Sequence, residues 1–210
     1  MEPLGVAERL LSSAPVGTVD AAGVRLAAAV QGHRALDRAM YALSEVANHS
    51  ALWHGINALD ALTGDGPRRR RALRRSALLA AEQALVNGPL KASVRRGRPE
   101  PRDDHPHELR TPLTSSFPSG HASAGACAAT LLTRDLGHGP LWWGLASVVA
   151  WSRVHVGVHH TSDVAAGAAV GTLLAVVGGR IWPPAPGAAT AGTTPSDAGT
   201  TTSATGVAQR

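Results

Sequence analysis

Three apolar segments in the second half of the chain most restrict what it can fold into. They cover residues 122–133, 141–151 and 164–179, are rich in Ala, Val, Leu and Gly, and contain no Asp, Glu, Lys or Arg. Each is shorter than the roughly 20 residues that span a bilayer, but each can extend into its flanks. The segments predict helices, either of a membrane protein or buried inside a soluble all-α protein. Gly167 and Gly171 in the third segment have the spacing that lets two helices approach closely in lipid.

The first half of the chain has a weaker pattern. Residues 1–33 show no clear periodicity and no features of a signal peptide. Between residues 35 and 62, apolar side chains recur at helical spacing, which predicts one amphipathic helix. A turn over 63–67, a run of arginines from Arg68 to Arg75 and a moderately apolar helix over 77–90 follow. The arginines could form a nucleic-acid patch or a basic cytoplasmic loop, and the apolar helix directly after them favours the loop.

Composition limits the classes of function. Of 210 residues, 44 % are apolar and 17 % are charged, which is typical of one folded domain with a tail. Aromatic residues make up only 3 %, which argues against a nucleic-acid module built on stacked aromatics. The net charge of +5 indicates an anionic partner. The single cysteine, Cys127, excludes an internal disulfide and a cysteine-based zinc site, and we expect it to be an inert core thiol.

We expect three regions along the chain. Residues 1–33 form a weakly ordered segment, residues 34–182 form a helical domain, and residues 183–210 form a disordered tail. The tail is rich in Pro, Gly, Ala, Ser and Thr and offers little apolar surface to offset the entropy of ordering the chain.

Residues able to perform chemistry collect at three places where a loop meets an apolar segment. The first place holds Lys91, the only lysine among 20 basic residues, and Arg98. The second is the turn Ser119-Gly120-His121 after Pro118. Backbone N–H groups of such a turn, at the start of a helix, suit an anion. His121 adds a group that can donate a proton near neutral pH.

The third place holds Arg153, His159 and Asp163. Asp163 follows His159 by four residues and can accept a hydrogen bond from one imidazole nitrogen, which leaves the other nitrogen free to attack. Thr161 or Ser162 can cap the helix that follows. The three cations supply positive charge for a phosphoryl group. We expect no metal and no cofactor, because no carboxylate cluster suggests a metal site and the adjacent His159 and His160 have poor geometry for chelation.

Taken in order, these residues resemble the signature of the type 2 phosphatidic acid phosphatase (PAP2) superfamily: K-x6-RP, PSGH and SR-x5-H-x3-D. The signature extends here from Lys91 to Asp163 with every position filled. The resemblance implies an all-α fold, a membrane-embedded bundle of about five helices, with the PAP2-type core within residues 34–182. It also implies metal-independent hydrolysis of a phosphate monoester or a diphosphate.

The resemblance implies a role for each residue of the signature. His159 would be the nucleophile that forms a phosphohistidine, Asp163 would orient it, and His121 would protonate the leaving oxygen. The phosphate-binding residues would be Lys91, Arg98, Ser119, Gly120 and Arg153. His155 and His160 match no position of the signature. We expect Arg95, Arg96 and Arg102 to form a solvated basic rim.

Within the superfamily, the apolar segments favour the small bacterial membrane members. Some of these act on polyprenyl phosphates, including decaprenylphosphoryl phosphoribose in cell-wall synthesis, and residues 37–53 are similar to that subgroup. We therefore expect a lipid phosphate substrate, either polyprenyl-linked or a phospholipid, a membrane as partner, and no nucleic acid. The alternatives are a soluble-type acid phosphatase and a non-enzymatic, anion-binding membrane protein.

The basic residues predict how the chain crosses a membrane. Arg68–Arg75 would face the cytoplasm, and the helix over 77–90 would bring Lys91 to the outer face. A hairpin with its tip at residues 134–140 would return to the cytoplasm, and the last helix would end there at Arg180. We expect a multi-pass protein of the cell membrane with its active site on the outer face.

Overall fold

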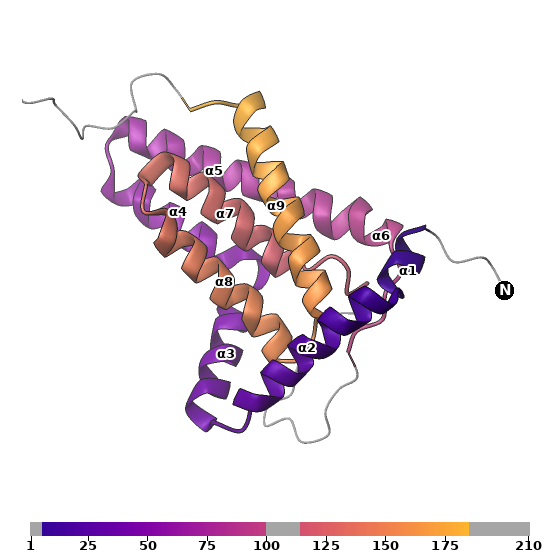
Figure 1. Cartoon of the computed structure of the whole chain (residues 1–210). Coiled ribbons are helices and arrows are strands. Elements are labelled where there is room, and N and C mark those ends of the chain that lie inside the picture. The colour runs from indigo at the N-terminus through magenta and orange to yellow at the C-terminus, as the bar shows by residue number, and fades with distance from the viewer. Residues whose placement is uncertain (1–5, 100–113, 185–210) are drawn as a thin grey trace, which may run out of the picture.

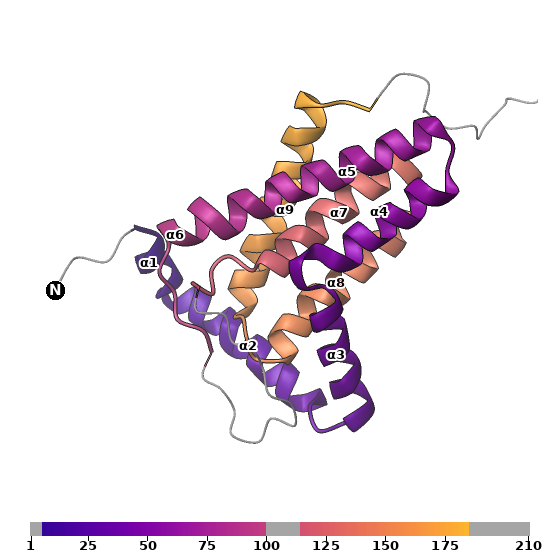
Figure 2. The ribbon, with the colours of Figure 1, turned by 180° about the vertical axis from the view of Figure 1, so that it is seen from behind.

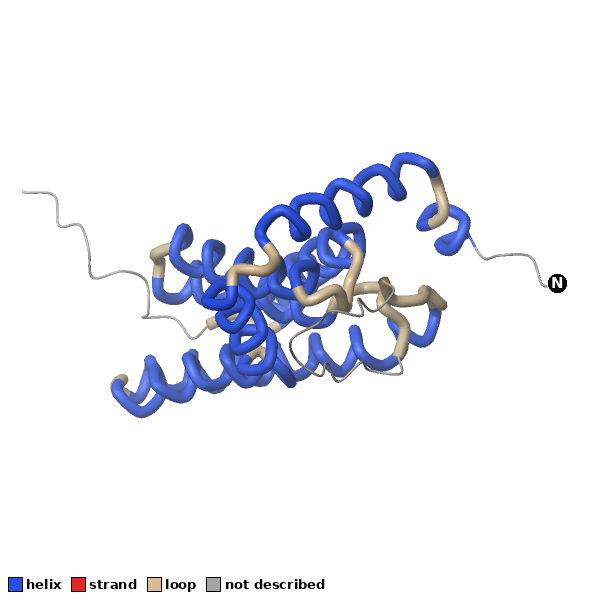
Figure 3. The backbone as a smooth tube through the Cα atoms, turned by 90° about the horizontal axis from the view of Figure 1, so that it is seen from below, coloured by secondary structure: helices blue, strands red, loops and turns tan. Residues whose placement is uncertain are grey.

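The computed structural model describes residues 6–99 and 114–184, and every regular element in them is a helix (Figure 1, Figure 3). Eight α-helices have six or more residues, which confirms the all-α class but exceeds the predicted five. They are α1 (Val6–Leu11), α2 (Ala14–Val30), α3 (Arg34–Val46), α4 (Ala51–Thr63), α5 (Gly66–Leu85), α7 (Gly120–Leu136), α8 (Gly139–His155) and α9 (Thr161–Ile181). Short helical segments are η1 (Asn48–Ser50), η2 (Val86–Leu90) and α6 (Lys91–Ser93).

The segment expected to be weakly ordered contains α1 and α2. Helix α2 has Pro15 in its first turn, a position that proline favours, and alanine, the strongest helix former, fills much of its length. Its buried residues are Asp20, Gly23 and Ala27 rather than large apolar side chains. A search for apolar periodicity therefore finds little in this segment, although one face of α2 is packed.

The prediction of one helix over residues 35–62 is wrong, because the chain turns sharply between α3 and α4 (Figure 2). His49 and Ser50 have φ angles of 52° and 61°. This left-handed conformation cannot continue a right-handed helix. Apolar residues keep their spacing on both sides of the turn, so the pattern alone does not reveal the break.

The prediction of a basic loop over Arg68–Arg75 is also wrong. Helix α5 begins at Gly66, and Asp65 caps it by accepting a hydrogen bond of 2.9 Å from the backbone N–H of Arg68. The arginines therefore lie on the first turns of a helix. Arg75 is only 1 % exposed; it forms an ion pair with Asp60 of α4 and a 3.0 Å hydrogen bond to Asp135 of α7.

The helix predicted over 77–90 is the second half of α5 followed by η2. Gly88 and Pro89 lie in η2, and Gly88 has non-helical backbone angles. Proline lacks the N–H that a continuing helix needs, so the chain bends here before it reaches α6 and Lys91.

Helix α7 lies at the centre of the bundle, and all its residues from Ala122 to Leu132 are buried. It packs mainly against α9, α8 and α5 (Figure 1). A Cβ atom added to Gly167 would lie 2.4 Å from the carbonyl oxygen of Ser119, and one on Gly171 would lie 2.0 Å from that of Ser123. The backbones of α7 and α9 are therefore in direct contact, as the glycine spacing predicts. Cys127 is buried in this core.

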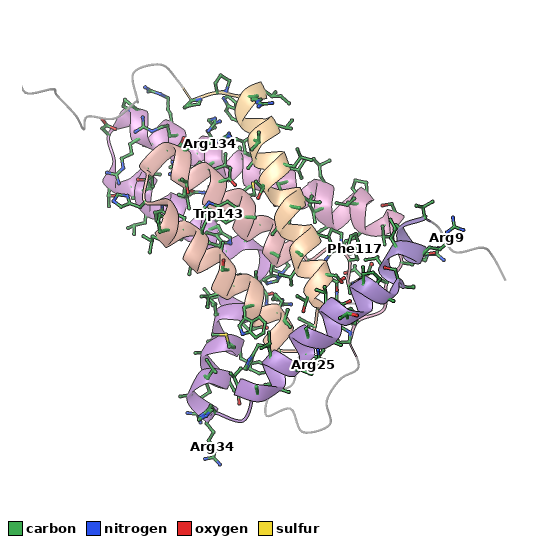
Figure 4. The ribbon with its side chains drawn as sticks, viewed as in Figure 1. Arg9, Arg25, Arg34, Phe117, Arg134 and Trp143 are labelled. Carbon is green, nitrogen blue, oxygen red and sulfur yellow. The ribbon has the colours of Figure 1, made fainter. Side chains whose placement is uncertain are left out.

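The two ends of α7 differ in character. Phe117 precedes its first turn, and Arg134 lies near its other end (Figure 4). The buried Arg75–Asp135 contact joins α5 to α7 at the Arg134 end. The residues of the three sequence clusters gather at the other end, and the site is built there. The expected disordered tail lies outside the described residues except for residues 183 and 184.

Candidate active site

A cavity of about 810 Å³ opens where α6, the start of α7, the end of α8 and the loop before α9 meet. The α3–α4 connection forms another part of its wall. The predicted site residues that line it are Lys91, Arg98, Gly120, His121, Arg153 and His159. The fold thus brings the three sequence clusters together, while the predicted residues Ser119 and Asp163 lie behind the cavity wall, each fully buried.

Two of the three cations, Arg98 and Arg153, are held by neighbouring groups. The Nη1 of Arg98 donates a 2.8 Å hydrogen bond to the carbonyl of Val158, and the guanidinium of Arg153 donates to the hydroxyl of Ser44 on α3. Burial, together with the charges of Arg98 and Arg153, lowers the pKa of Lys91 to about 8. Like charges confined in one cavity repel one another, so an anion bound among them would relieve that repulsion.

His159 is only 3 % exposed, and Asp163 faces one side of its ring. The distance from His159 Nδ1 to Asp163 Oδ2 is 3.6 Å, slightly longer than a hydrogen bond. Burial lowers the pKa of His159 to about 4, although Asp163 opposes this shift. The imidazole is therefore neutral near pH 7, and Nε2 is the nitrogen that can attack.

Arg96 fixes the carboxylate of Asp163 from behind. Its Nη1 donates to Asp163 Oδ1 and, at 2.7 Å, to the hydroxyl of Ser162. Its Nη2 lies 2.6 Å from Asp20 Oδ2 on α2. The side chain of Arg96 is only 13 % exposed, so the prediction of a solvated rim is wrong for this residue. Arg95 is exposed, and Arg102 lies outside the described residues.

The start of α9 is held by α2 rather than capped by Thr161 or Ser162. The helix begins at Thr161, and His160 is its N-cap residue. The backbone N–H and the hydroxyl of Ser162 donate to the two carboxylate oxygens of Asp20, at 2.8 and 2.9 Å. Asp20 is the only acidic residue of α2, and a lone acid among small residues is the signal that could have identified it.

The turn before α7 is shaped mainly by contacts with the protein. The backbone N–H of Ser119 donates to the carbonyl of Asp163 at 3.0 Å, and its hydroxyl accepts from the N–H of Ala122. The side-chain Oδ1 of Asn87 would lie 2.8 Å from a Cβ atom on Gly120, so a larger residue at this position would have to displace that side chain. Ser119 therefore positions the turn, and Gly120 and His121 line the cavity.

His121 is oriented by the same residue that contacts Arg153. The backbone carbonyl of Ser44 lies beside the ring of His121 and raises the pKa of that imidazole against the effect of burial. The ring nitrogen Nε2 is buried and has no hydrogen-bond partner in residues 6–99 and 114–184. Ser44 thus holds the candidate acid and one candidate phosphate-binding cation, and sequence reasoning missed it.

His155, which matches no position of the signature, has a structural contact. Its Nε2 lies 2.8 Å from Asp37 Oδ1, in a fully buried link between α8 and α3. Within the described part of the chain, no group of three or more His, Cys, Asp or Glu side chains is arranged to hold a metal ion. The cavity therefore combines three cations, which suit an anion, with two imidazoles. His121 comes from the start of α7 and His159 from the loop before α9.

Comparison with known proteins identifies the family. The sequence profile of the PAP2 superfamily matches residues 73–184. Over 158 residues the chain is 37 % identical to the decaprenylphosphoryl-5-phosphoribose phosphatase of Mycolicibacterium smegmatis, a match that covers 75 % of this chain and 84 % of that protein. The chain belongs to the PAP2 superfamily. It is a PAP2 phosphatase, which confirms the resemblance that the motifs carry.

Other relatives agree with this assignment. The PAP2 phosphatase described here is 36 % identical over 138 residues to the decaprenylphosphoryl-5-phosphoribose phosphatase of Mycobacterium tuberculosis H37Rv, covering 64 % of this chain and 74 % of that one.

Two solved structures share its fold. The transmembrane PAP2 type phosphatidylglycerolphosphate phosphatase of Bacillus subtilis superposes with a TM-score of 0.62 at 24 % identity, covering 82 % of this chain and 89 % of that chain. The LpxE of Aquifex aeolicus superposes with a TM-score of 0.58 at 22 % identity, covering 75 % and 92 %.

Proposed function

We propose that this PAP2 phosphatase removes the terminal phosphate monoester from a polyprenyl-linked sugar phosphate at a membrane. The observation that carries the proposal is the convergence of His121, His159 and three cations on one cavity. The substrate class follows from the curated relatives of 36–37 % identity, which are decaprenylphosphoryl-5-phosphoribose phosphatases.

The reaction proceeds in two displacements. Nε2 of His159 attacks phosphorus, the bond from phosphorus to the ester oxygen breaks, and His121 gives its proton to that leaving oxygen. The product is an alcohol and a phosphohistidine. His121 then takes a proton from a water molecule, which attacks phosphorus and breaks the nitrogen–phosphorus bond. Inorganic phosphate leaves, and His159 is restored.

The cations take the part that a metal plays in many phosphatases. Lys91, Arg98 and Arg153 neutralise the charge on the phosphoryl oxygens in both transition states. Asp163 stabilises the positive charge that develops on His159 as the nitrogen–phosphorus bond forms. The 3.6 Å separation between the two groups closes to a hydrogen bond as that charge develops. We therefore expect hydrolysis to be independent of added metal ions.

Exposed apolar side chains support a membrane location and disfavour a soluble-type acid phosphatase. Large apolar residues lie on the outer surface of several helices of the bundle. Examples that are at least 57 % exposed are Leu59, Leu62, Leu73, Leu141, Leu173 and Ile181. Together, so many exposed apolar side chains would be unfavourable on a surface in contact with water. Of the described helices, one is long and apolar enough to cross a membrane, and it is α9.

A phosphate-release assay on the purified protein in detergent tests this function. The substrates are decaprenylphosphoryl-5-phosphoribose, phosphatidic acid, phosphatidylglycerophosphate and a polyprenyl diphosphate, each with and without EDTA. We expect the highest kcat/KM on the first substrate, no loss of activity in EDTA, and inhibition by vanadate, which adopts a five-coordinate geometry. Preference for a phospholipid would overturn the substrate class, and activity that needs a divalent ion would overturn the mechanism.

A further inference from the structure

The cavity has a second polar wall that the hydrolysis of a phosphate ester does not use. Glu45, Asn48, His49 and Ser50, from the end of α3 and from η1, line it together with the catalytic residues. A carboxylate such as that of Glu45 repels phosphate oxygens, so this wall does not suit the anion itself. It suits a neutral group that carries several hydrogen-bond donors.

We infer that this wall, formed by Glu45, Asn48, His49 and Ser50, is a subsite for the hydroxyl groups of a sugar joined to the phosphate that is removed. The inference rests on the proposed function and names the part of the substrate that the enzyme recognises beyond phosphate. The hydroxyls donate to the carboxylate of Glu45, and the remaining side chains of the wall complete the hydrogen bonding.

Ser50 gives evidence of a missing partner. It is 2 % exposed, it lines the cavity, and its Oγ has no hydrogen-bond partner in the part of the chain that the structure describes. Buried polar atoms in proteins almost always have a partner, because leaving one unpaired is costly. A hydroxyl of the substrate placed in the cavity would satisfy this atom.

Glu45 lies close both to Arg153, one of the three cations, and to Asn48, another residue of the wall. Its charge is close enough to Arg153 to raise the pKa of that guanidinium against the effect of burial. Its Oε2 accepts a 2.9 Å hydrogen bond from the side-chain nitrogen of Asn48, which fixes the carboxylate and the amide together. A group bound to Glu45 is therefore adjacent to the phosphate site, as a sugar attached to that phosphate would be.

The backbone of the wall is held in an uncommon conformation. His49 and Ser50 both have positive φ angles although neither is glycine. Non-glycine residues in this region cost free energy, and they concentrate at functional sites, where the surrounding structure holds them. The turn places Asn48, His49 and Ser50 on the cavity, where a continuous helix would have carried them past it.

Three water-soluble esters test the subsite: ribose 5-phosphate, glycerol 3-phosphate and n-pentyl phosphate, which has five carbons and no hydroxyl. The variants are Glu45→Gln and Ser50→Ala, and Glu8→Gln on α1, outside the cavity lining, is the matched control. The measurement is kcat/KM on each ester, with thermal unfolding to confirm that each variant is folded.

We expect the wild type to prefer ribose 5-phosphate to pentyl phosphate. Glu45→Gln should lower this preference about tenfold, because a neutral amide replaces a charged acceptor, and Ser50→Ala about threefold, because the hydroxyl partner is lost. Glu8→Gln should keep the wild-type preference.

Equal losses on both esters in Glu45→Gln would overturn the subsite, because Glu45 would then act only through Arg153. Equal preference for ribose and glycerol esters would overturn its assignment to a sugar. Turnover of decaprenylphosphoryl-5-phosphoribose but of none of the esters by the wild type would overturn the subsite alone, and turnover of neither would overturn the proposed function.

Discussion

His159 is prepared for its proposed role by where it is buried. It lies in the short connection between α8 and α9, yet it is only 3 % exposed. Burial disfavours the imidazolium, so a neutral ring with one nitrogen toward Asp163 is the form present near pH 7. The same environment makes truncation to alanine a poor test, because it would leave a cavity.

Replacement of His159 by Asn tests the nucleophile with little change in packing. We expect turnover to fall by about 10⁴-fold or more, because no other group takes over the attack. Wild-type enzyme quenched in alkali after reaction with labelled substrate should carry the label on His159. A label on the neighbouring His160 would contradict this assignment, and far-UV circular dichroism is the control for folding.

The pKa of Lys91, lowered to about 8, predicts an alkaline limb in the pH profile. As the pH rises through 8, the ammonium loses its proton and one positive charge leaves the phosphate site, so kcat/KM should fall. Lys91→Arg keeps its charge above this pH and should remove the alkaline limb. Its kcat at pH 7 should still fall about 10- to 100-fold, because a planar guanidinium displaces the phosphate. A variant that retains the limb near pH 8 would show that another group titrates there.

At the scale of elements, α2 and the segment before the phosphate-binding turn hold the start of α9. Arg96 pairs with Asp163 on one side and Asp20 on the other. Arg96→Gln removes the positive charge behind Asp163, so the carboxylate then stabilises the protonated form of His159 more strongly. The pKa of His159 should rise from about 4 toward the ordinary value near 6.5, and the acidic limb of kcat/KM should move upward with it. Arg95→Gln, at the exposed neighbouring position, is the control, and equal shifts in both variants would contradict the prediction.

The contact between α7 and α9 predicts the effect of one methyl group. A Cβ atom on Gly171 would lie 2.0 Å from the carbonyl oxygen of Ser123, so Gly171→Ala must push the two helices apart. We expect a loss of about 1–3 kcal/mol in the free energy of unfolding, together with lower activity. Ala169→Leu on the exposed face of the same helix is the control. An unchanged melting temperature for Gly171→Ala would contradict the close contact.

The helices predicted correctly from the sequence are those whose apolar pattern is local. The apolar segments predicted the helices α7 to α9, and the spacing of Gly167 and Gly171 predicted their close contact. The sequence did not reveal the break at His49 and Ser50, because a left-handed backbone at two residues does not change the spacing of the apolar residues around it. Sequence reasoning also missed Asp20, Ser44 and the buried role of Arg96. Each of these acts through a partner far away in the chain, such as Ser162 for Asp20, and one sequence read locally does not record such pairs.

At the scale of the whole molecule, four of the exposed arginines, Arg69, Arg70, Arg134 and Arg180, lie on segments at the end opposite the cavity. Basic residues remain on the cytoplasmic side of membranes, so the cavity should open on the outer face. Single cysteines at Gly66 and Ala92, in a Cys127→Ser background, test this orientation in intact cells. An impermeant maleimide should label the cysteine at Ala92 and spare the one at Gly66 until the membrane is permeabilised. The reverse result would place the active site in the cytoplasm.

The hydrogen bond between Asp20 and Ser162 joins residues 142 positions apart, so it cannot form until most of the chain has been made. At translation rates of about 5–20 residues per second, α2 waits roughly 10–30 s for its partner to leave the ribosome. During that interval the growing chain gains Lys91, Arg98 and His121 before it gains His159. The start of α9 therefore gains its contact with Asp20 only after every other described helix of the bundle has been made.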